Sequence, residues 1–167
     1  MKPPMSPGRS KQALKDELER VLATALETLE RTHQAAREGA THEEAKPEND
    51  KDTRALEQSY LARGQAMRIE ELRTGLADVQ ALPVRTFGEG QPAALGALVA
   101  AEEGDEERLL LLFLAPHGGG TLLAEGAVSV ITPGSPLGRA VLGKRAGDEC
   151  NVRIAGRVRE LRVARVE

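Results

Sequence analysis

The chain has 167 residues, which suits one ordinary domain or two small ones. Its net charge of −3 gives no global attraction to nucleic acid or to anionic lipid. A single cysteine excludes a disulfide framework within one chain and a metal site built from several thiolates.

The first residues carry no sign of export or membrane insertion. Residues 1–9 contain three prolines and a glycine, and we expect them to be a disordered lead-in without the apolar stretch of a signal peptide. The longest apolar run, Leu109–Ala115, is too short to cross a bilayer. We therefore expect a cytoplasmic protein that does not contact the membrane.

Residues 10–81 are rich in Leu, Ala and charged side chains and predict two long helices. Ser10 can cap the first helix, and a second helical run extends from about Asp50 to Val79. Each run has a narrow apolar stripe at spacings of three and four, which is typical of a coiled-coil seam. In the first helix the stripe is Leu14, Leu18, Leu22, Ala25, Leu29 and Ala36, and in the second it is Ala55, Ser59, Ala62, Ala66, Ile69, Leu72, Leu76 and Val79.

Folded back on each other, these helices form an antiparallel hairpin whose bulky residues meet at the base and whose small residues meet near the tip. Tyr60 is expected to pack in the distal half. Residues 39–52 form the tip. Within it Gly39 is a plausible C-cap for the first helix, and Thr41 with Glu44 fits a capping box for one short further turn.

Residues 83–167 predict a β-rich domain with one short helix. Ser135 caps this helix, Pro136 takes its first position and Gly143 ends it. Apolar runs bounded by turn residues predict strands near 94–101, 108–115, 122–124, 127–131, 150–154 and 158–166. The chain is thus an α+β protein, with Cys150 as a small core residue. The five arginines of Arg153–Arg165 form either a basic patch or a solvated strand face.

One segment of this second domain resembles a known family. The run VSVITPGSPLGRAVLGKRAGDECNV (Val128–Val152) is similar to the C-terminal signature of the GreA/GreB transcription elongation factors. The resemblance implies an FKBP-like domain that docks at the rim of the secondary channel of bacterial RNA polymerase core. Arg139, Lys144 and Arg145 are the candidate docking residues.

The resemblance also implies how such a factor acts. The coiled coil enters the channel, and carboxylates at its tip share the polymerase's second Mg²⁺ in trans and orient a water. The polymerase then hydrolyses the 3′ end of backtracked RNA. Mg²⁺ prefers oxygen ligands and binds through few carboxylates, which suits such a tip. The factor itself is a non-enzymatic monomer that holds no metal of its own, and its candidate tip residues are Glu43, Glu44, Glu48, Asp50 and Asp52.

The tip departs from the family pattern G-D-L-x-E-N-A. Aligned from the first helix, Glu43 falls on the family's glutamate, but Ala40 replaces its aspartate. Aligned from the second helix, Glu48 falls on the aspartate and Lys51 on the glutamate. Neither register keeps both acids. Two readings therefore stay open: stimulation of cleavage, and regulation through the same channel without it, as in Gfh-like or DksA-like factors. A coiled-coil interaction module unrelated to polymerase is the third alternative.

Residue types and their spacing argue against a prolyl isomerase, a dedicated metal site and a hydrolase. Prolyl isomerase sites are lined with aromatic side chains, and this chain has no Trp, one Tyr and two Phe. The three histidines, His33, His42 and His117, lack the spacing of a dedicated metal site. No nucleophile–base constellation suggests a hydrolase.

Overall fold

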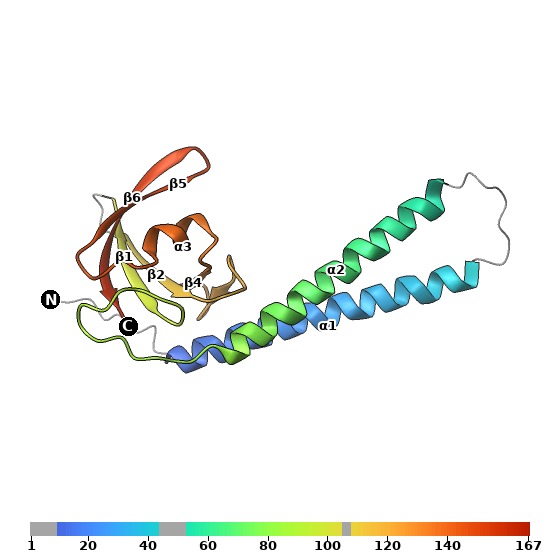
Figure 1. The fold of residues 1–167 in the computed structure, drawn as a ribbon, viewed down its shortest axis with the longest axis horizontal. Coiled ribbons are helices and arrows are strands. Elements are labelled where there is room, and N and C mark those ends of the chain that lie inside the picture. Colours follow the sequence, from blue (N-terminus) through green and yellow to red (C-terminus); the bar gives the residue numbers. More distant parts are fainter. Residues whose placement is uncertain (1–9, 44–52, 105–107) are drawn as a thin grey trace. The chain divides into compact units, whose positions relative to one another are not determined.

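The computed structural model describes residues 10–43, 53–104 and 108–167. Two long helices are followed by a six-stranded mixed sheet and one short helix, which confirms the α+β class (Figure 1). The elements are α1 (Lys11–Glu43), α2 (Thr53–Ala81), β1 (Leu98–Glu103), β2 (Arg108–Leu114), β3 (Leu122–Leu123), β4 (Val128–Ile131), α3 (Pro136–Val141), β5 (Glu149–Ile154) and β6 (Arg157–Val166).

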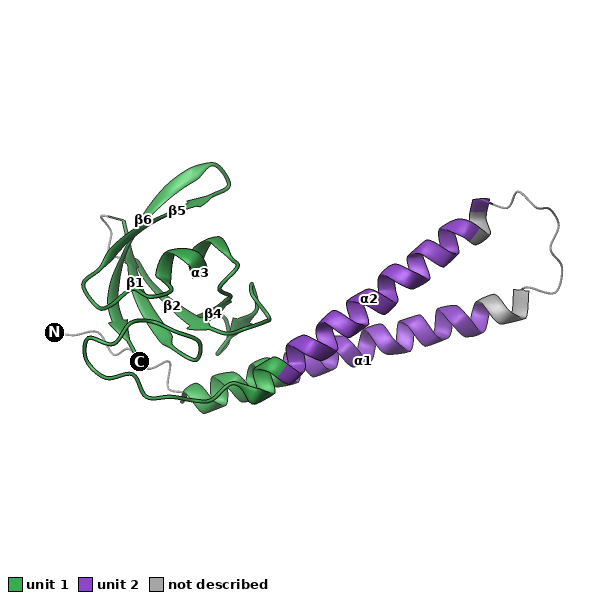
Figure 2. Ribbon diagram, in the orientation of Figure 1, with its two compact units in different colours: residues 1–19, 78–167 green, residues 20–77 purple. Residues whose placement is uncertain are grey.

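The chain divides into two compact units (Figure 2). The first comprises residues 1–19 and 78–167, and the second comprises residues 20–77. Both divisions fall inside helices, so the first turns of α1 and the last turn of α2 belong to the same unit as the sheet.

The sheet has the strand order β3-β4-β2-β1-β6-β5. Its neighbours are antiparallel except β2 and β4, which are parallel, and the pairing of β1 with β6 shifts register between Ala100 and Ala101. The core lies between the sheet and α3, where Val141 joins a buried cluster with Val99, Leu112, Leu114 and Val163. All six strands predicted from the sequence are confirmed, with ends that differ by four residues at most.

The helix α3 begins as the sequence predicts. The Ser135 hydroxyl accepts a hydrogen bond from the Gly138 amide at 3.0 Å and donates one to the Thr132 carbonyl at 2.8 Å. Pro136 occupies the first helical position. Gly138 is required because a Cβ there would lie 1.7 Å from the Thr132 carbonyl oxygen. The helix therefore sits directly on the end of β4.

The helices of the second unit form the expected hairpin. Leu22 and Ile69 are buried, Arg73 bridges to Glu30 at 2.6 Å, and His33 lies 3.2 Å from Gln65. Part of the predicted seam is wrong, because Ala25, Ala36, Ser59 and Ala66 are exposed. Tyr60, which was expected to pack in the distal half, is exposed as well. Leu26 and Gln65 are partly buried instead. A seam at strict heptad spacing drifts around a straight helix of 3.6 residues per turn, so the stripe read from the bulky end misplaces the distal contacts.

The end of α1 also differs from the prediction. Ser10 caps its start, with its hydroxyl accepting from the Ala13 amide at 3.2 Å. Gly39 does not end it, however, and the helix runs on to Glu43, which places Thr41 inside the helix and not at the start of a new turn. A glycine weakens a helix but ends it only where the backbone turns left-handed, and Gly39 has no positive φ.

Candidate functional site

The acidic tip is the first candidate site. Glu43 is the last residue of α1, whereas Glu44, Glu48, Asp50 and Asp52 lie outside the described residues. The structure shows which elements hold this segment at both ends. The 33 residues of α1 and 29 of α2 correspond to rods of roughly 50 and 44 Å at 1.5 Å per residue. The chain therefore enters and leaves the tip segment through two long helices.

The flank of the hairpin is unexpectedly apolar. Leu56, Tyr60, Leu61 and Met67 of α2 are 57–68% exposed. Two shallow grooves of about 400 and 540 Å³ run along the unit and share Leu29 and Arg68 in their walls. Of these four residues the sequence analysis assigns a role only to Tyr60, and Leu56, Leu61 and Met67 lie outside the predicted seam.

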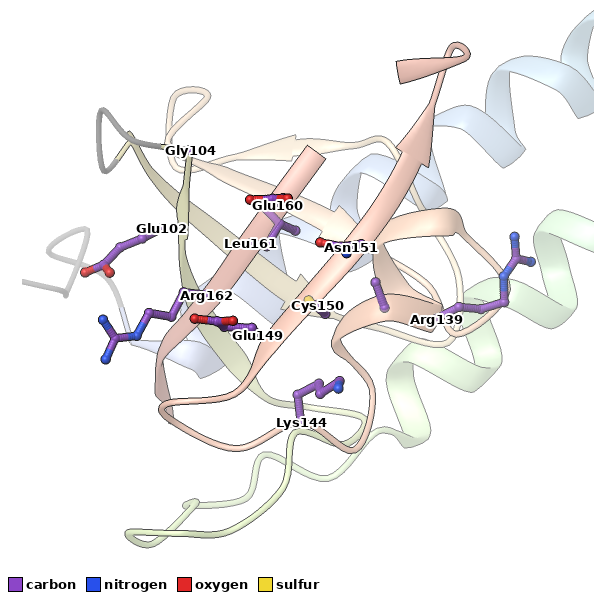
Figure 3. A pocket seen from close by; sticks show the side chains of 11 residues that line it. Glu102, Gly104, Arg139, Lys144, Glu149, Cys150, Asn151, Glu160, Leu161 and Arg162 are labelled. Carbon is purple, nitrogen blue, oxygen red and sulfur yellow. The ribbon is translucent and has the colours of Figure 1, made fainter. Parts of the chain in front are cut away.

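The second candidate site is a groove of about 850 Å³ beside α3 and β5 (Figure 3). Two of the three predicted docking residues, Arg139 and Lys144, line it, and Arg145 does not. The Arg139 guanidinium is oriented by a hydrogen bond to the Gly134 carbonyl at 2.7 Å. The remaining lining residues are Glu102, Gly104, Ala140, Glu149, Cys150, Asn151, Glu160, Leu161 and Arg162.

The groove carries charges of both signs on neighbouring strands. Arg162 of β6 stands opposite Glu102 of β1 on one side and opposite Glu149 of β5 on the other. Figure 3 shows these three side chains at one end of the groove, with Lys144 and Arg139 on the side of α3. The mixture suits a protein surface with matching charges better than a single anion or cation.

Cys150 is partly buried in the wall of this groove, close to the expected core position. Burial raises the pKa of its thiol, although the charge of Lys144 acts in the opposite direction. The thiol is therefore protonated at neutral pH. A protonated, half-buried thiol is a packing group and a poor nucleophile.

The arginines of the last strands do not form one continuous basic patch. Arg159 is ion-paired with Glu103, and Arg165 with Glu167. The hydrogen bond from Arg159 lowers the pKa of the Glu103 carboxyl. Arg153, Arg157 and Arg162 are exposed. The solvated strand face is the better description of the two left open by the sequence.

Contacts of the start of α1 and the end of α2 tie both helices to the β-rich part of the first unit, and sequence reasoning missed them. Both carboxylate oxygens of Glu17 lie 3.2 Å from the Ala124 amide, and His117 lies 2.9 Å from Asp78. Leu18 fills the space beside Gly118, where a Cβ would come within 2.7 Å of it. The partners in each contact lie far apart in the chain, so no local pattern could have revealed these contacts.

The described residues hold no cluster of metal-ligating side chains and no membrane-spanning helix. Among them, no three His, Cys, Asp or Glu side chains gather closely enough to hold a metal ion. No described helix is long and apolar enough to cross a membrane.

The chain is similar to transcription factors of known structure. A transcription factor Gfh1 is 25% identical with a TM-score of 0.41, over 93% of this chain and 94% of that one. Thermus aquaticus Gfh1 is 26% identical with a TM-score of 0.41, over 89% of this chain and 92% of that one. The prokaryotic transcription elongation factor GreA/GreB from Nitrosomonas europaea is 22% identical with a TM-score of 0.37, over 59% and 78%. No protein-family model and no curated protein sequence matches the chain.

Proposed function

We propose that this protein is a non-enzymatic factor that binds bacterial RNA polymerase core through its β-rich domain and acts on transcript cleavage or pausing through its acidic tip. The observation that carries the proposal is the combination of two features in one chain. A hairpin of two long helices ends in a carboxylate-rich segment. The segment 128–152, which resembles the Gre signature, folds as strand β4, a Ser135-capped helix and the strand β5.

The chemistry follows from the charge at the tip. Five carboxylates and two lysines lie within Glu43–Asp52, so these ten residues alone carry a net charge of −3, as much as the whole chain. Carboxylates delivered beside a polymerase's Mg²⁺ ions can add a ligand to the second metal and orient a water for attack on a phosphodiester. Because the metal and the RNA belong to the polymerase, the factor needs no cofactor of its own.

The docking role falls to the domain with the mixed-charge groove. Arg139 and Lys144 present cations from α3 and the loop after it, and Glu149 and Glu160 present anions from β5 and β6. Opposite charges arranged at fixed positions favour one orientation of a protein partner over others. Substituting Arg139 and Lys144 together with Glu should weaken polymerase binding without unfolding the domain, since neither side chain belongs to the core.

Transcript cleavage by a stalled elongation complex tests the tip mechanism. The test variant changes Glu43, Glu44, Glu48, Asp50 and Asp52 to Ala, and a control variant changes exposed acids elsewhere, Glu27, Glu71 and Glu89. The tip variant should bind polymerase as the parent does and lose its effect on RNA cleavage or pausing, whereas the control keeps the effect. An unchanged effect of the tip variant rules out the mechanism. Stimulation and inhibition by the parent protein distinguish the Gre-like action from the Gfh-like or DksA-like one.

A coiled-coil interaction module is the second candidate, and the apolar flank of the hairpin favours it. Exposed Leu61 and Met67 would be covered if another helix packed along α2. The double variant L61E/M67E should then abolish a complex that the tip variant leaves intact. This candidate is favoured over the first if neither variant loses polymerase binding and the hairpin instead forms a complex with a different protein.

A further inference from the structure

We propose that the outer edge of β5 pairs with the β5 edge of a second copy of this chain, in an antiparallel register centred on Asn151. The inference rests on the strand edge and not on the proposed function, although Glu149 and Asn151 also line the mixed-charge groove, and it departs from the monomer expected from the sequence. Because β5 is the last strand of the sheet, its outer edge has no neighbouring strand among the described residues. Unpaired edges of this kind are templates for strand addition.

The turn of the β5–β6 hairpin fixes which residues point outward. Ala155 and Gly156 have φ values of 50° and 79°, as in a two-residue type I′ turn. Ile154 and Arg157 flank this turn and form a hydrogen-bonded pair, and such pairs alternate along an antiparallel ladder. The amides and carbonyls of Glu149, Asn151 and Arg153 therefore point to the outer edge. Their side chains share the exposed face of the strand.

These three residues make the edge self-complementary. With Asn151 opposite its own copy, Glu149 of each chain stands opposite Arg153 of the other, so that two ion pairs form about one dyad. A shift of two residues in either direction breaks both pairs. Charged side chains usually protect an edge strand because they repel the same charges on a second edge strand. Here Glu149 and Arg153 have opposite charges and lie symmetrically about Asn151, so they attract each other across the dyad.

The charges within one chain point to the same occupant. Glu102 of β1, Arg162 of β6 and Glu149 of β5 stand side by side across three strands, with alternating sign (Figure 3). The last charge of this row, at the free edge of the sheet, is the carboxylate of Glu149. Arg153 of a second copy supplies the next cation in the same row. On the opposite face, Cys150 would stand against Val152 of the second copy, so both faces of the pair match.

Sedimentation equilibrium of the full-length protein tests this pairing. A strand pair this short buries less area than a standard interface, so we expect a weak dimer with a Kd on the order of 10–100 µM. Because like charges would then face each other across the dyad, R153E and E149R should each raise the Kd about ten-fold. The double variant E149R/R153E reverses both charges and should restore the dimer. Circular dichroism checks that each variant is folded.

Cysteine crosslinking gives a second measurement that fixes the register. In a C150S background, N151C should form an intermolecular disulfide under mild oxidation, since hydrogen-bonded antiparallel partners lie about 5.5 Å apart between Cα atoms. The control C150S/V158C places an exposed thiol on β6, which would lie more than roughly 14 Å from its copy, because three strand spacings and an offset along the strands separate the two. A monomer at every concentration, a dimer indifferent to the charge substitutions, or equal crosslinking of both variants overturns the proposal.

Discussion

At the scale of single residues, the junction between β4 and α3 is the most tightly determined point in the chain. The Thr132 carbonyl accepts from the Ser135 hydroxyl and also lies where a side chain on Gly138 would have to be. The Ser-Pro start of the helix could be predicted from the sequence because capping is a local preference. The need for glycine at 138 could not, because it depends on how closely the helix approaches the preceding strand.

Replacing Gly138 with Ala should therefore destabilise the domain severely. A Cβ at 1.7 Å from a backbone oxygen forces the helix away from β4, and overpacking of this kind costs about 1–3 kcal/mol or more. The matched control is Gly134→Ala, because a Cβ there meets nothing within 4 Å and the residue has no positive φ. Urea denaturation should separate the two variants clearly. Equal midpoints would show that the helix does not lie as close to Thr132 as described.

The ion pair of Glu103 with Arg159 predicts a pH-dependent contribution to stability. The pKa of the Glu103 carboxyl is lower in the folded protein than in the unfolded chain. The stabilisation is therefore present above the unfolded pKa and is lost as the pH falls through the folded pKa. The variant E103Q should be less stable than the parent at neutral pH, by on the order of 1 kcal/mol because the pair is partly solvated. The difference should vanish in strongly acidic buffer. A difference that persists unchanged at acid pH would mean that the charge of Glu103 is not its cause.

At the scale of elements, the sequence predicts nearly every helix and strand but not how the hairpin packs. Strands alternate with a period of two and are bounded by Gly and Pro, so each one was recognisable from its own residues. The hairpin seam depends on how the apolar stripes of two helices drift along their length. The bulky residues Leu14, Leu18 and Leu22 are buried as predicted, although Leu18 lies against Gly118, whereas the small residues farther out gave too little contrast to fix the contact face.

The end of α1 provides a test at this scale. Because Gly39 lies within the helix and is exposed, with nothing within 4 Å of a Cβ, Gly39→Ala should stabilise the protein by up to about 1 kcal/mol. A left-handed C-cap at this position, as the sequence first suggested, would make the same substitution destabilising. A rise in the thermal midpoint thus indicates that Gly39 lies within α1, and a fall indicates that it caps the helix.

At the scale of the whole molecule, the proposed function depends on two groups of residues, the acids of the tip and the charged side chains of the groove. The candidate tip acids were identified from composition and from their place between two helices, and four of the five lie outside the described residues. The groove of the β-rich domain brings Arg139 and Lys144 together with acids from three strands, which sequence spacing could not predict. Both features make sense if one part of the chain holds a large partner while the other presents carboxylates to it.

The most direct test of this idea is binding of the purified full-length protein to bacterial RNA polymerase core. We expect saturable one-to-one binding that weakens when Arg139 and Lys144 are both changed to Glu, and that survives replacement of the five tip acids by Ala. Binding should also weaken as salt rises, because opposite charges hold the two proteins together. Failure of the parent protein to associate with core polymerase at any accessible concentration would contradict the proposed function.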